Sequence, residues 1–543
     1  MRHHTSRSAI ASALALLLSA CSVVAPREWV SVKLAAINDF HGYIQASSEP
    51  ITVGEAFTPR LAGGIARIAT LVETLRAQNR YFAFVSAGDL IGASPLISAA
   101  FNDEPTIETM NAAGLDFNGV GNHEFDAGIA ELRRMQTGGC PATGCKTGTA
   151  FGGARFGFLA ANVIEKATGK PLFPPYGVRQ FGSIKIAFIG VTLKGTPEIS
   201  SARNVAGLEF RDEAESVNAL VPELKQQGIE AIIVLIHEGG TTRGGPNECV
   251  DLRGPIRDIV ERLDRAVDLV LSGHTHQAYV CNLNGRLVTS AGSYGRFVTE
   301  IDLQIDPVSR DIVSARALNR VVELDIPASG RASAVMERYA QLAAPLHRVV
   351  GRIAAPFFRG INADGESRLG QLIADAHLAA TRSAGATVAF VNPGGIRAPL
   401  SPEGDVTYAQ VFDVYPFNNT LVTMTLTSAQ LRELLEQQWQ GEYPRVLQVS
   451  SGFTYAWNAN APAGSRVVRD SIMLDGRRLE PDGSYRIAVN SYLAAGGDRF
   501  TLLLEGAERS AGLNSREAIV RYLEMRSPLA PGGERRIRRV QRE

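Results

Sequence analysis

The chain has 543 residues, which is long enough for roughly two to four domains, and we expect two. Lysine plus arginine (55) balances aspartate plus glutamate (55), so the chain lacks the basic excess that binds a nucleic-acid backbone, and we expect no nucleic-acid polymer as partner. A hydrophobic share of 45% and a charged share of 20% exclude an extensively disordered chain.

The first residues show a pattern typical of an export signal. Arg2 and Arg7 precede an apolar run at residues 9–18, which is too short to span a bilayer comfortably, and small residues then lead to Cys21. This pattern resembles a bacterial lipobox, which implies cleavage before Cys21 and acylation of its thiol; an ordinary secretory signal is the alternative. We therefore expect residues 1–21 to be a signal peptide with a lipobox cysteine. The protein is then an exported periplasmic or cell-surface lipoprotein of a bacterium, held to the membrane only by its N-terminal lipid anchor.

Residues 22–326 predict an α/β domain with buried strands. The clearest apolar runs lie at residues 33–37, 81–85, 184–189, 231–236 and 267–271. These runs are continuous rather than alternating, so we expect both faces of each strand to be buried, with helices packed outside the sheets.

Four further cysteines, an even number, suit an oxidising compartment. They are Cys140, Cys145, Cys249 and Cys281. Four cysteines allow three pairings, of which sequence proximity favours Cys140 with Cys145 and leaves Cys249 with Cys281. Free thiols or a zinc knuckle are the alternatives, but no pair has the two-residue spacing of a knuckle.

Residues 327–352 are predicted to link this domain to a second one. The segment 331–344 is rich in helix formers and lies between prolines, which predicts a connecting helix. Residues 353–543 then predict a second α/β domain. Its expected elements are a helix at 370–380 and strands at 387–391, 420–426, 465–474 and 485–489.

Almost every buried strand of the first domain runs into a cluster of metal-binding side chains. The clusters contain Asp39 with His41, Asp89, Asn122 with His123 and Asp126, His237, and His274 with His276. The carboxyl ends of strands converge on one site in layered α/β proteins, so these side chains are expected to meet. Alternate side chains of an extended chain point to one side, which would bring Asp39 with His41 into one cavity.

Imidazole, carboxylate and amide ligands without thiolates suit a hydrolytic site that holds Zn, Mn, Co or Fe. Two other histidines, His347 and His377, lie on predicted helices and are expected to be structural.

In this order, the clusters resemble the five-block signature of the calcineurin-like metallophosphoesterases. Asn-Asp-Phe-His-Gly at 38–42 and Gly-Asn-His-Glu-Phe-Asp at 121–126 are similar to the 5'-nucleotidase family. The resemblance implies an N-terminal four-layer α/β/β/α metallophosphoesterase domain, a connecting helix and a C-terminal α/β substrate-binding domain.

The resemblance also implies two divalent metal ions. It assigns Asp39, His41 and His276 to one ion, Asn122, His237 and His274 to the other, and Asp89 to both. His123 is then the group that stabilises the transition state or protonates the leaving oxygen, and Asp126 orients its ring. A helix-capping carboxylate beside a buried histidine is the alternative for this pair.

Three segments of the second domain, 392–397, 415–419 and 491–498, resemble the substrate-binding blocks of the same family. By that likeness Phe417 and Tyr492 sandwich a base, Asn419 reads its edge, Asp498 holds the ribose hydroxyls, and Asn392 and Arg397 contact ribose or phosphate. The chain departs from its relatives in two places. Tyr492 stands where relatives often carry phenylalanine, and residues 363–370 lack the extra arginines, which leaves Arg368, with Arg359 as the weaker candidate, to replace them.

We expect hydrolysis of nucleoside 5'-monophosphates to nucleoside and phosphate by a metal-activated water. A 2',3'-cyclic nucleotide 2'-phosphodiesterase with 3'-nucleotidase activity, or a UDP-sugar or dinucleotide pyrophosphatase, would use the same metals. A surface lipoprotein that binds nucleotides without catalysis is the alternative of another class, and the complete ligand set argues against it.

Overall fold

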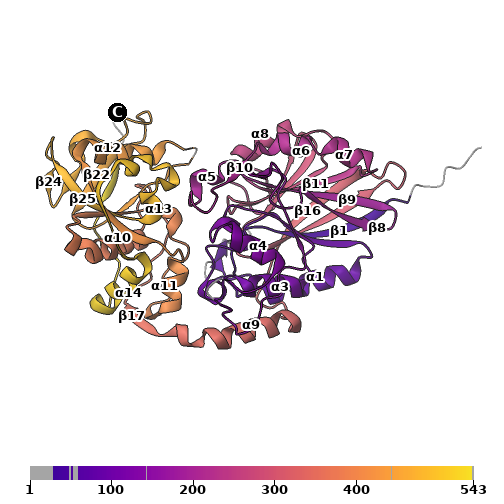
Figure 1. The fold of residues 1–543 in the computed structure, drawn as a ribbon, viewed down its shortest axis with the longest axis horizontal. Coiled ribbons are helices and arrows are strands. Elements are labelled where there is room, and N and C mark those ends of the chain that lie inside the picture. Colours follow the sequence, from indigo (N-terminus) through magenta and orange to yellow (C-terminus); the bar gives the residue numbers. More distant parts are fainter. Residues whose placement is uncertain (1–27, 48–49, 53–58, 142–143, 442, 541–543) are drawn as a thin grey trace, which may run out of the picture.

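The computed structural model describes residues 28–540, apart from 48–49, 53–58, 142–143 and 442. The predicted signal peptide with Cys21 lies outside these residues. The described chain folds into two lobes that are joined along one side by a long helix (Figure 1). Within these ranges, no helix is both long and apolar enough to cross a bilayer.

Two six-stranded sheets form the centre of the N-terminal lobe. The first has the order β16 (Ile312–Val321), β15 (Phe297–Ile305), β1 (Val30–Ile37), β4 (Phe82–Ser86), β5 (Phe117–Gly119) and β6 (Gly157–Leu159). The second has the order β13 (Ala278–Leu283), β14 (Arg286–Ala291), β12 (Leu269–Ser272), β11 (Ala231–His237), β9 (Ile184–Thr192) and β8 (Tyr176–Phe181). Strands β1, β4, β5 and β6 are parallel, as are β9, β11, β12 and β14. The parallel strands place their carboxyl ends at one edge of each sheet.

Strand β11 explains why the apolar runs are continuous. Ile232 and Val234 pack into the core beneath the outer helices, whereas Ile233 and Leu235 pack into the core between the two sheets. Successive side chains of a strand point to opposite faces, so a strand buried on both sides needs an apolar residue at every position. The prediction of strands buried on both faces is confirmed.

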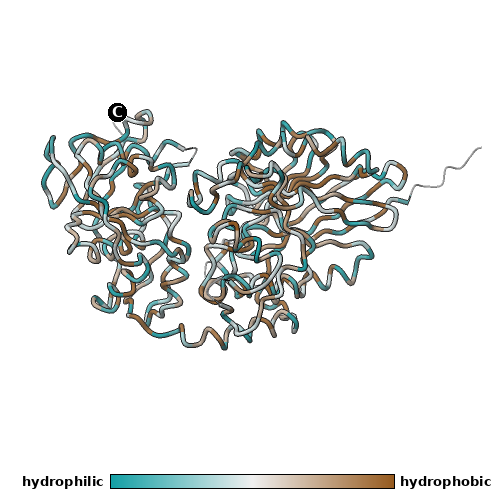
Figure 2. The backbone as a smooth tube through the Cα atoms, viewed as in Figure 1, coloured by the Kyte–Doolittle hydropathy of each residue, from teal (hydrophilic) through white to brown (hydrophobic). Residues whose placement is uncertain are grey.

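Helices cover the outer face of each sheet and complete four layers. Helices α1 (Ile65–Gln78) and α3 (Glu104–Ala113) contribute to the core on the first sheet. Helices α6 (Glu213–Asn218) and α8 (Pro255–Arg262) contribute to the core on the second. Figure 2 shows the hydrophobic strands of this lobe enclosed between more polar helices. The expected α/β/β/α arrangement is confirmed.

The C-terminal lobe is a second α/β unit. Its five-stranded sheet has the order β21 (Gln448–Val449), β18 (Val388–Val391), β25 (Ser484–Asn490), β20 (Thr420–Thr427) and β26 (Ala507–Asn514). Helices α10 (Arg368–Thr381) and α14 (Ser515–Arg526) pack together beside it. A smaller sheet has the order β24 (Arg477–Arg478), β23 (Met473–Leu474), β22 (Phe453–Asn458) and β27 (Ile537–Val540).

The strand predicted at 465–474 is wrong for most of its length. Only Met473–Leu474 is a strand there, and Arg469–Ser471 forms a turn of 3-10 helix. The hydroxyl of Ser471 donates to the carbonyl of Val468 at 2.6 Å and accepts from the backbone N–H of Ala456 at 2.8 Å. Serine side chains that bond to backbone groups compete with strand pairing. The pattern of apolar residues in this segment did not reveal such hydrogen bonds.

Helix α9 (Gly330–Ala343) joins the lobes, which also touch directly. Leu96, in α2 (Leu96–Ala99) of the N-terminal lobe, packs with Ala409 and Phe412 from α11 (Tyr408–Val414) of the C-terminal lobe. The carboxylate of Asp413 accepts a hydrogen bond from the backbone N–H of Leu96 at 2.9 Å. The two lobes are therefore in contact on the side of the connecting helix.

Both disulfides that sequence proximity favoured are present. Cys140 pairs with Cys145, and Cys249 pairs with Cys281 of β13.

Candidate metal centre and substrate cleft

The predicted metal ligands lie at the carboxyl ends of the central strands. Asp39 and His41 follow β1, Asp89 follows β4, Asn122 and His123 follow β5, His237 ends β11, and His274 and His276 follow β12. Asp39, His41, Asp89, Asn122 and His237 are almost completely buried, at 0 to 3% exposure. The structure brings all of these strand ends to one place, as the sequence predicted.

The local backbone differs from the extended chain that we expected. Asp39, His41, Asp89, His274 and His276 all adopt left-handed backbone angles, with φ between 47° and 72°. Non-glycine residues rarely adopt this conformation, which costs about 1 to 3 kcal/mol each and is concentrated at functional sites. Tight turns, rather than strand alternation, therefore point these side chains inward.

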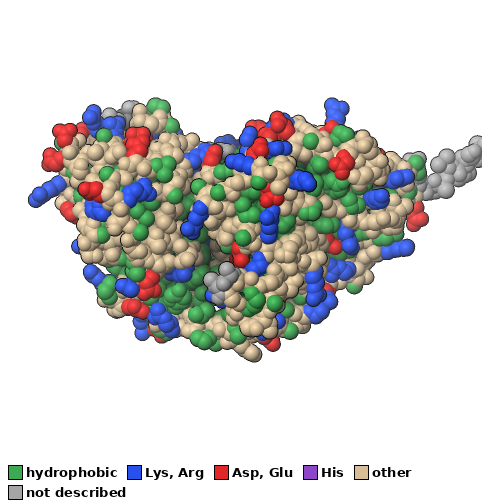
Figure 3. Space-filling model, in the orientation of Figure 1, with side chains coloured by type: hydrophobic (Ala, Val, Ile, Leu, Met, Phe, Trp, Pro, Cys, Tyr) green, Lys and Arg blue, Asp and Glu red, His purple; other side chains and the backbone are tan. Residues whose placement is uncertain are grey.

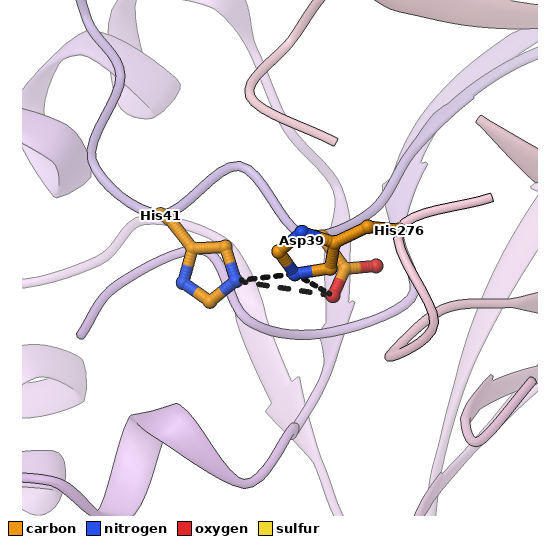
Figure 4. Close-up of side chains that lie close together, drawn as sticks. All are labelled: Asp39, His41 and His276. Atoms are coloured by element: carbon orange, nitrogen blue, oxygen red, sulfur yellow. Dashed lines mark hydrogen bonds and ion pairs between the residues drawn. The ribbon is translucent and has the colours of Figure 1, made fainter. Parts of the chain in front are cut away.

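One group of ligands consists of Asp39, His41 and His276, which point toward one another (Figure 4). The Nε2 atom of His276 lies 3.3 Å from the Oδ1 atom of Asp39, and the Nε2 atoms of His41 and His276 are 3.2 Å apart. Backbone N–H of His274 donates to both carboxylate oxygens of Asp39, at 3.1 and 2.9 Å, and fixes its orientation.

A second group combines Asp89 with His237 and Asp39. The Oδ2 atom of Asp89 lies 2.9 Å from the Nε2 atom of His237 and 3.7 Å from the Nε2 atom of His41, so it faces both groups. The ring of His274 lies 5.5 Å from that of His237, between centroids. Gly121 permits the carboxylate of Asp89 to lie close to the backbone that precedes Asn122, because a Cβ atom at position 121 would lie 2.2 Å from the Oδ1 atom of Asp89.

The chemistry of these side chains fits divalent cations. The Nδ1 atoms of His41 and His237 face the carbonyls of Gly92 and Ala87 at 2.9 and 2.8 Å. A carbonyl only accepts, so each Nδ1 donates and each Nε2 is turned toward the carboxylates, where it binds a cation once it has lost its proton, as in metal-binding histidines. The Oδ1 atom of Asn122 is buried without a hydrogen-bond partner and is also free to bind a cation.

The charges in the site agree with this assignment. Although burial opposes the shift, Asp89 and Asp39 raise the pKa of His237 to about 10. Burial likewise opposes the lowering of the pKa of Asp39, which His276 and His237 bring to about 2. The site is therefore a buried negative cavity that favours positive charge.

His123 and Asp126 form a hydrogen-bonded pair at the edge of this centre. The Nδ1 atom of His123 donates to the Oδ2 atom of Asp126 at 2.7 Å, and the backbone N–H of His123 donates to Asp89 at 2.8 Å. Burial lowers the pKa of His123, but Asp126 and Asp89 outweigh it and raise the pKa above its usual value. The ring is therefore oriented, and its protonated form is favoured.

A cleft of about 1650 Å³ runs from this centre between the two lobes. Figure 3 shows a notch in the outline of the molecule where the lobes meet. The N-terminal lobe contributes Asn122, His123, Asp126, His274 and the segment 197–204. The C-terminal lobe contributes Asn392, Arg397, Phe417, Asn419, Tyr492 and Asp498, which are six of the seven predicted substrate-binding residues.

Arg397 connects the C-terminal lobe to the metal centre. Its Nη2 atom lies 3.4 Å from the Nε2 atom of His41, and its Nε atom is buried without a partner. A half-buried guanidinium whose Nε donor is buried and unused is suited to bind an anion next to the metal ligands.

Comparisons with known proteins agree with this architecture. A family model for calcineurin-like phosphoesterases matches residues 32–278, and one for the 5'-nucleotidase C-terminal domain matches residues 349–505. The crystal structure of a 5'-nucleotidase precursor from Thermus thermophilus is 29% identical, with a TM-score of 0.79 over 94% of this chain and 100% of that chain. The chain belongs to the 5'-nucleotidase family of calcineurin-like phosphoesterases.

Two curated relatives match nearly the whole chain but differ in their own length. "Endonuclease YhcR" of Bacillus subtilis is 32% identical over 95% of this chain, which spans only 41% of that relative's own length. The "5'-nucleotidase" of Vibrio cholerae is 26% identical over 97% of this chain and 98% of its own length.

Asp498, at the position where the 5'-nucleotidase family resemblance places ribose recognition, is held by three side chains. Its Oδ2 atom accepts from Asn392 at 2.8 Å, and its Oδ1 atom lies 3.0 Å from the hydroxyl of Tyr492 and 3.1 Å from Arg445. Asp498 and Arg499 both have left-handed backbone angles, with φ of 56° and 65°. The tyrosine hydroxyl, where relatives often have phenylalanine, thus helps to fix this carboxylate.

Arg368 does not reach the cleft. Its guanidinium donates to Gln371 at 2.9 Å and to the carbonyl of Glu534 at 2.6 Å, at the start of α10. Arg359 lines a separate pocket with Ser367 and Ile396, although its charge adds to the burial that lowers the pKa of His276. Of Arg359, Arg368 and Arg397, Arg397 is therefore the one that lines the cleft beside the metal ligands. His377 is structural, as expected: it is buried in α10, and burial lowers its pKa to about 4.

The sequence reasoning missed several residues of the site. Glu124 is buried and accepts from the backbone N–H of Asp89, Leu90 and Gly121 at 2.8 to 2.9 Å, which ties two ligand loops together. Glu124 lies inside the 121–126 motif, so the sequence could have identified it as part of the site. No local pattern indicated Arg445, which reaches Asp498 from far along the chain.

Proposed function

We propose that this chain is a metal-dependent phosphoester hydrolase that converts nucleoside 5'-monophosphates to nucleoside and phosphate. The observation that carries the proposal is the position of Arg397. It brings a half-buried guanidinium from the C-terminal lobe to within 3.4 Å of His41, in the same cleft that contains Phe417, Tyr492 and Asp498. One cavity thus offers a phosphate-binding end and an end suited to a base and a ribose.

In this proposal two divalent cations are held at the centre. Asp39, His41 and His276 hold one, Asn122, His237 and His274 hold the other, and Asp89 faces both. Bound there, the cations would polarise the phosphoryl oxygens and lower the pKa of a water, so that hydroxide would be available as the nucleophile near neutral pH.

The remaining steps belong to side chains of the chain itself. His123, oriented by Asp126 at 2.7 Å, donates a proton to the leaving ribose oxygen. Arg397 binds the phosphate, and Asp498 accepts hydrogen bonds from the ribose hydroxyls. Stacking between aromatic rings is worth about 1 to 3 kcal/mol per base, and Phe417 and Tyr492 supply the rings. Asn392 contacts ribose or phosphate, and Asn419 reads the edge of the base.

The size of the cleft favours one second candidate. Pockets for small ligands are typically about 300 to 1,000 Å³, and this cleft of about 1650 Å³ leaves room beyond a mononucleotide. A nucleotide whose phosphate carries a further sugar or nucleoside is therefore the alternative substrate.

The proposal also includes export and anchoring through Cys21. The two disulfides support export because they suit an oxidising compartment.

A substrate panel tests both candidates. Purified protein supplied with Mn²⁺, Zn²⁺ or Co²⁺ is incubated with AMP, 2',3'-cyclic AMP, UDP-glucose and NAD, and the released phosphate and nucleoside are measured. Phosphate and adenosine from AMP, lost after chelation, are the expected products. Turnover confined to UDP-glucose or NAD would favour the second candidate, and no turnover of any of the four compounds would contradict the proposed nucleotide hydrolysis.

A further inference from the structure

We propose that Glu198 and Arg499 form an ion pair between the lobes that holds the turn at residues 496–499 in the shape that presents Asp498 to the ribose. Glu198 is thereby a positioning residue for substrate, although it lies in the other lobe. The inference rests on the proposed function, because it assumes that Asp498 binds ribose.

The first observation is the contact itself. Glu198 lies in α5 (Thr196–Ile199), at the edge of the N-terminal lobe that faces the C-terminal lobe (Figure 1). Its Oε2 atom accepts from Nη2 of Arg499 at 2.6 Å and from Nε at 2.8 Å. Next to this pair, the hydroxyl of Tyr492 lies 3.0 Å from the carbonyl oxygen of Ile199. Two adjacent polar contacts therefore join α5 to the substrate-binding lobe.

The second observation is the backbone of the turn. Asp498 and Arg499 are consecutive non-glycine residues with φ of 56° and 65°. Such residues keep left-handed angles only where surrounding contacts hold them. Asn392 and Arg445 hold the carboxylate of Asp498 from within its own lobe, and the hydroxyl of Tyr492 accepts from the backbone N–H of Asp498 at 2.9 Å. For the guanidinium of Arg499, the hydrogen-bond partner among the described residues is Glu198, so the second strained residue is held from across the cleft.

These contacts couple the position of the lobes to the shape of the site. When the lobes separate, Arg499 loses its partner and only the contacts within the C-terminal lobe still hold the turn, so Asp498 is held less firmly toward the ribose. Ribose binding and lobe contact must then favour each other to the same extent. Both side chains are about half exposed, at 52% and 47%, so the effect is modest. Exposed ion pairs change an equilibrium by about two- to fivefold and weaken as salt is added.

Charge reversal in the full chain tests the coupling. The variants are E198R, R499E and the double reversal E198R/R499E, with E517Q, which removes an exposed ion pair on α14 with Arg521, as control. The binding of adenosine is measured by calorimetry, and kcat/KM is measured with AMP and with p-nitrophenyl phosphate, which has no ribose. Each single reversal is expected to weaken adenosine binding about fivefold and to lower the AMP to p-nitrophenyl phosphate ratio of kcat/KM to a similar extent. The double reversal is expected to recover most of both losses, and E517Q to resemble the wild type.

Salt provides a readout that a merely structural role would not move. Adenosine is uncharged, so raising KCl should weaken its binding to the wild type and leave E198Q, which lacks the pair, nearly unchanged.

The outcomes separate this inference from the proposed function. If the wild type binds adenosine but cleaves no AMP, the proposed function is wrong. The adenosine affinities of the variants then still test whether the Glu198–Arg499 pair is coupled to ribose binding. The coupling is overturned if single reversals bind adenosine as the wild type does, or if the double reversal recovers nothing. A wild type that binds no adenosine overturns it as well.

Discussion

Arg397, in the C-terminal lobe, lies 3.4 Å from the Nε2 atom of His41, in the N-terminal lobe. The two residues are 356 positions apart in the chain, yet their contact places the guanidinium that we propose binds phosphate beside the candidate metal ligands. The site is thus complete only when the lobes are together, and the predictions below follow from its parts.

Removing the charge of Arg397 should weaken phosphate binding. A hydrogen bond to a charged group is worth about 1.5 to 3 kcal/mol, so we expect R397Q to lower kcat/KM about 10- to 100-fold with AMP and with p-nitrophenyl phosphate alike. Steady-state kinetics measure both. R368Q is the matched comparison: Arg368 bonds to Gln371 and the Glu534 carbonyl, so its loss should change kcat/KM less than twofold. The reverse order of effects would place the phosphate at Arg368.

Removing the carboxylate that faces both ligand groups should empty the metal centre. We expect D89N to bind less than half of the metal that the wild type holds and to lose at least about 100-fold in kcat, because the Asp89 charge is shared by both sites. Metal per protein is measured by mass spectrometry after gel filtration. Chelation of the wild type should also lower its melting temperature, since a ligand that binds only the folded state stabilises it. Full activity of metal-free protein would contradict the metal centre.

Replacing His123 should affect poor leaving groups more than good ones. A general acid is worth about 100- to 10,000-fold where the leaving oxygen needs a proton, as the ribose oxygen of AMP does. We expect H123N to lose activity in this range with AMP but much less with p-nitrophenyl phosphate, whose leaving group departs unprotonated. D126N should show the same pattern more weakly, because Asp126 only orients the ring. Equal losses on both substrates would assign His123 a different role.

Asp413 should make the stability of the protein depend on pH. Burial raises the pKa of this carboxyl, at the contact between the lobes, to about 7, whereas an unfolded aspartate has a pKa of about 3.9. Between these values the folded state binds more protons than the unfolded state, so stability falls as pH rises from about 4 to about 7. D413N keeps an acceptor for the Leu96 N–H without this titration. We expect its melting temperature to match the wild type at pH 4 and to exceed it by about 2 to 4 °C at pH 8. A difference that does not depend on pH would show that Asp413 stays ionised.

Much of this architecture was predictable because buried parallel strands leave a plain signal. The runs at 33–37, 184–189 and 231–236 contain almost nothing but apolar residues, and they became β1, β9 and β11. The strand expected at 465–474 failed because the hydroxyl of Ser471 bonds to the carbonyl of Val468 and closes a turn of 3-10 helix at Arg469–Ser471. Local hydrogen bonding of this kind leaves no periodic pattern.

The amino-acid sequence alone determined the kind of chemistry at the site, because the ligand side chains follow their strands directly and their order along the chain is specific. It did not determine how those side chains turn inward, which depends on left-handed turns at Asp39, His41 and Asp89 that only surrounding contacts stabilise. Contacts across the cleft, such as Arg397 with His41 and Arg499 with Glu198, were decided by tertiary structure alone. Their partners lie hundreds of residues apart, and only the packing of one lobe against the other brings them together.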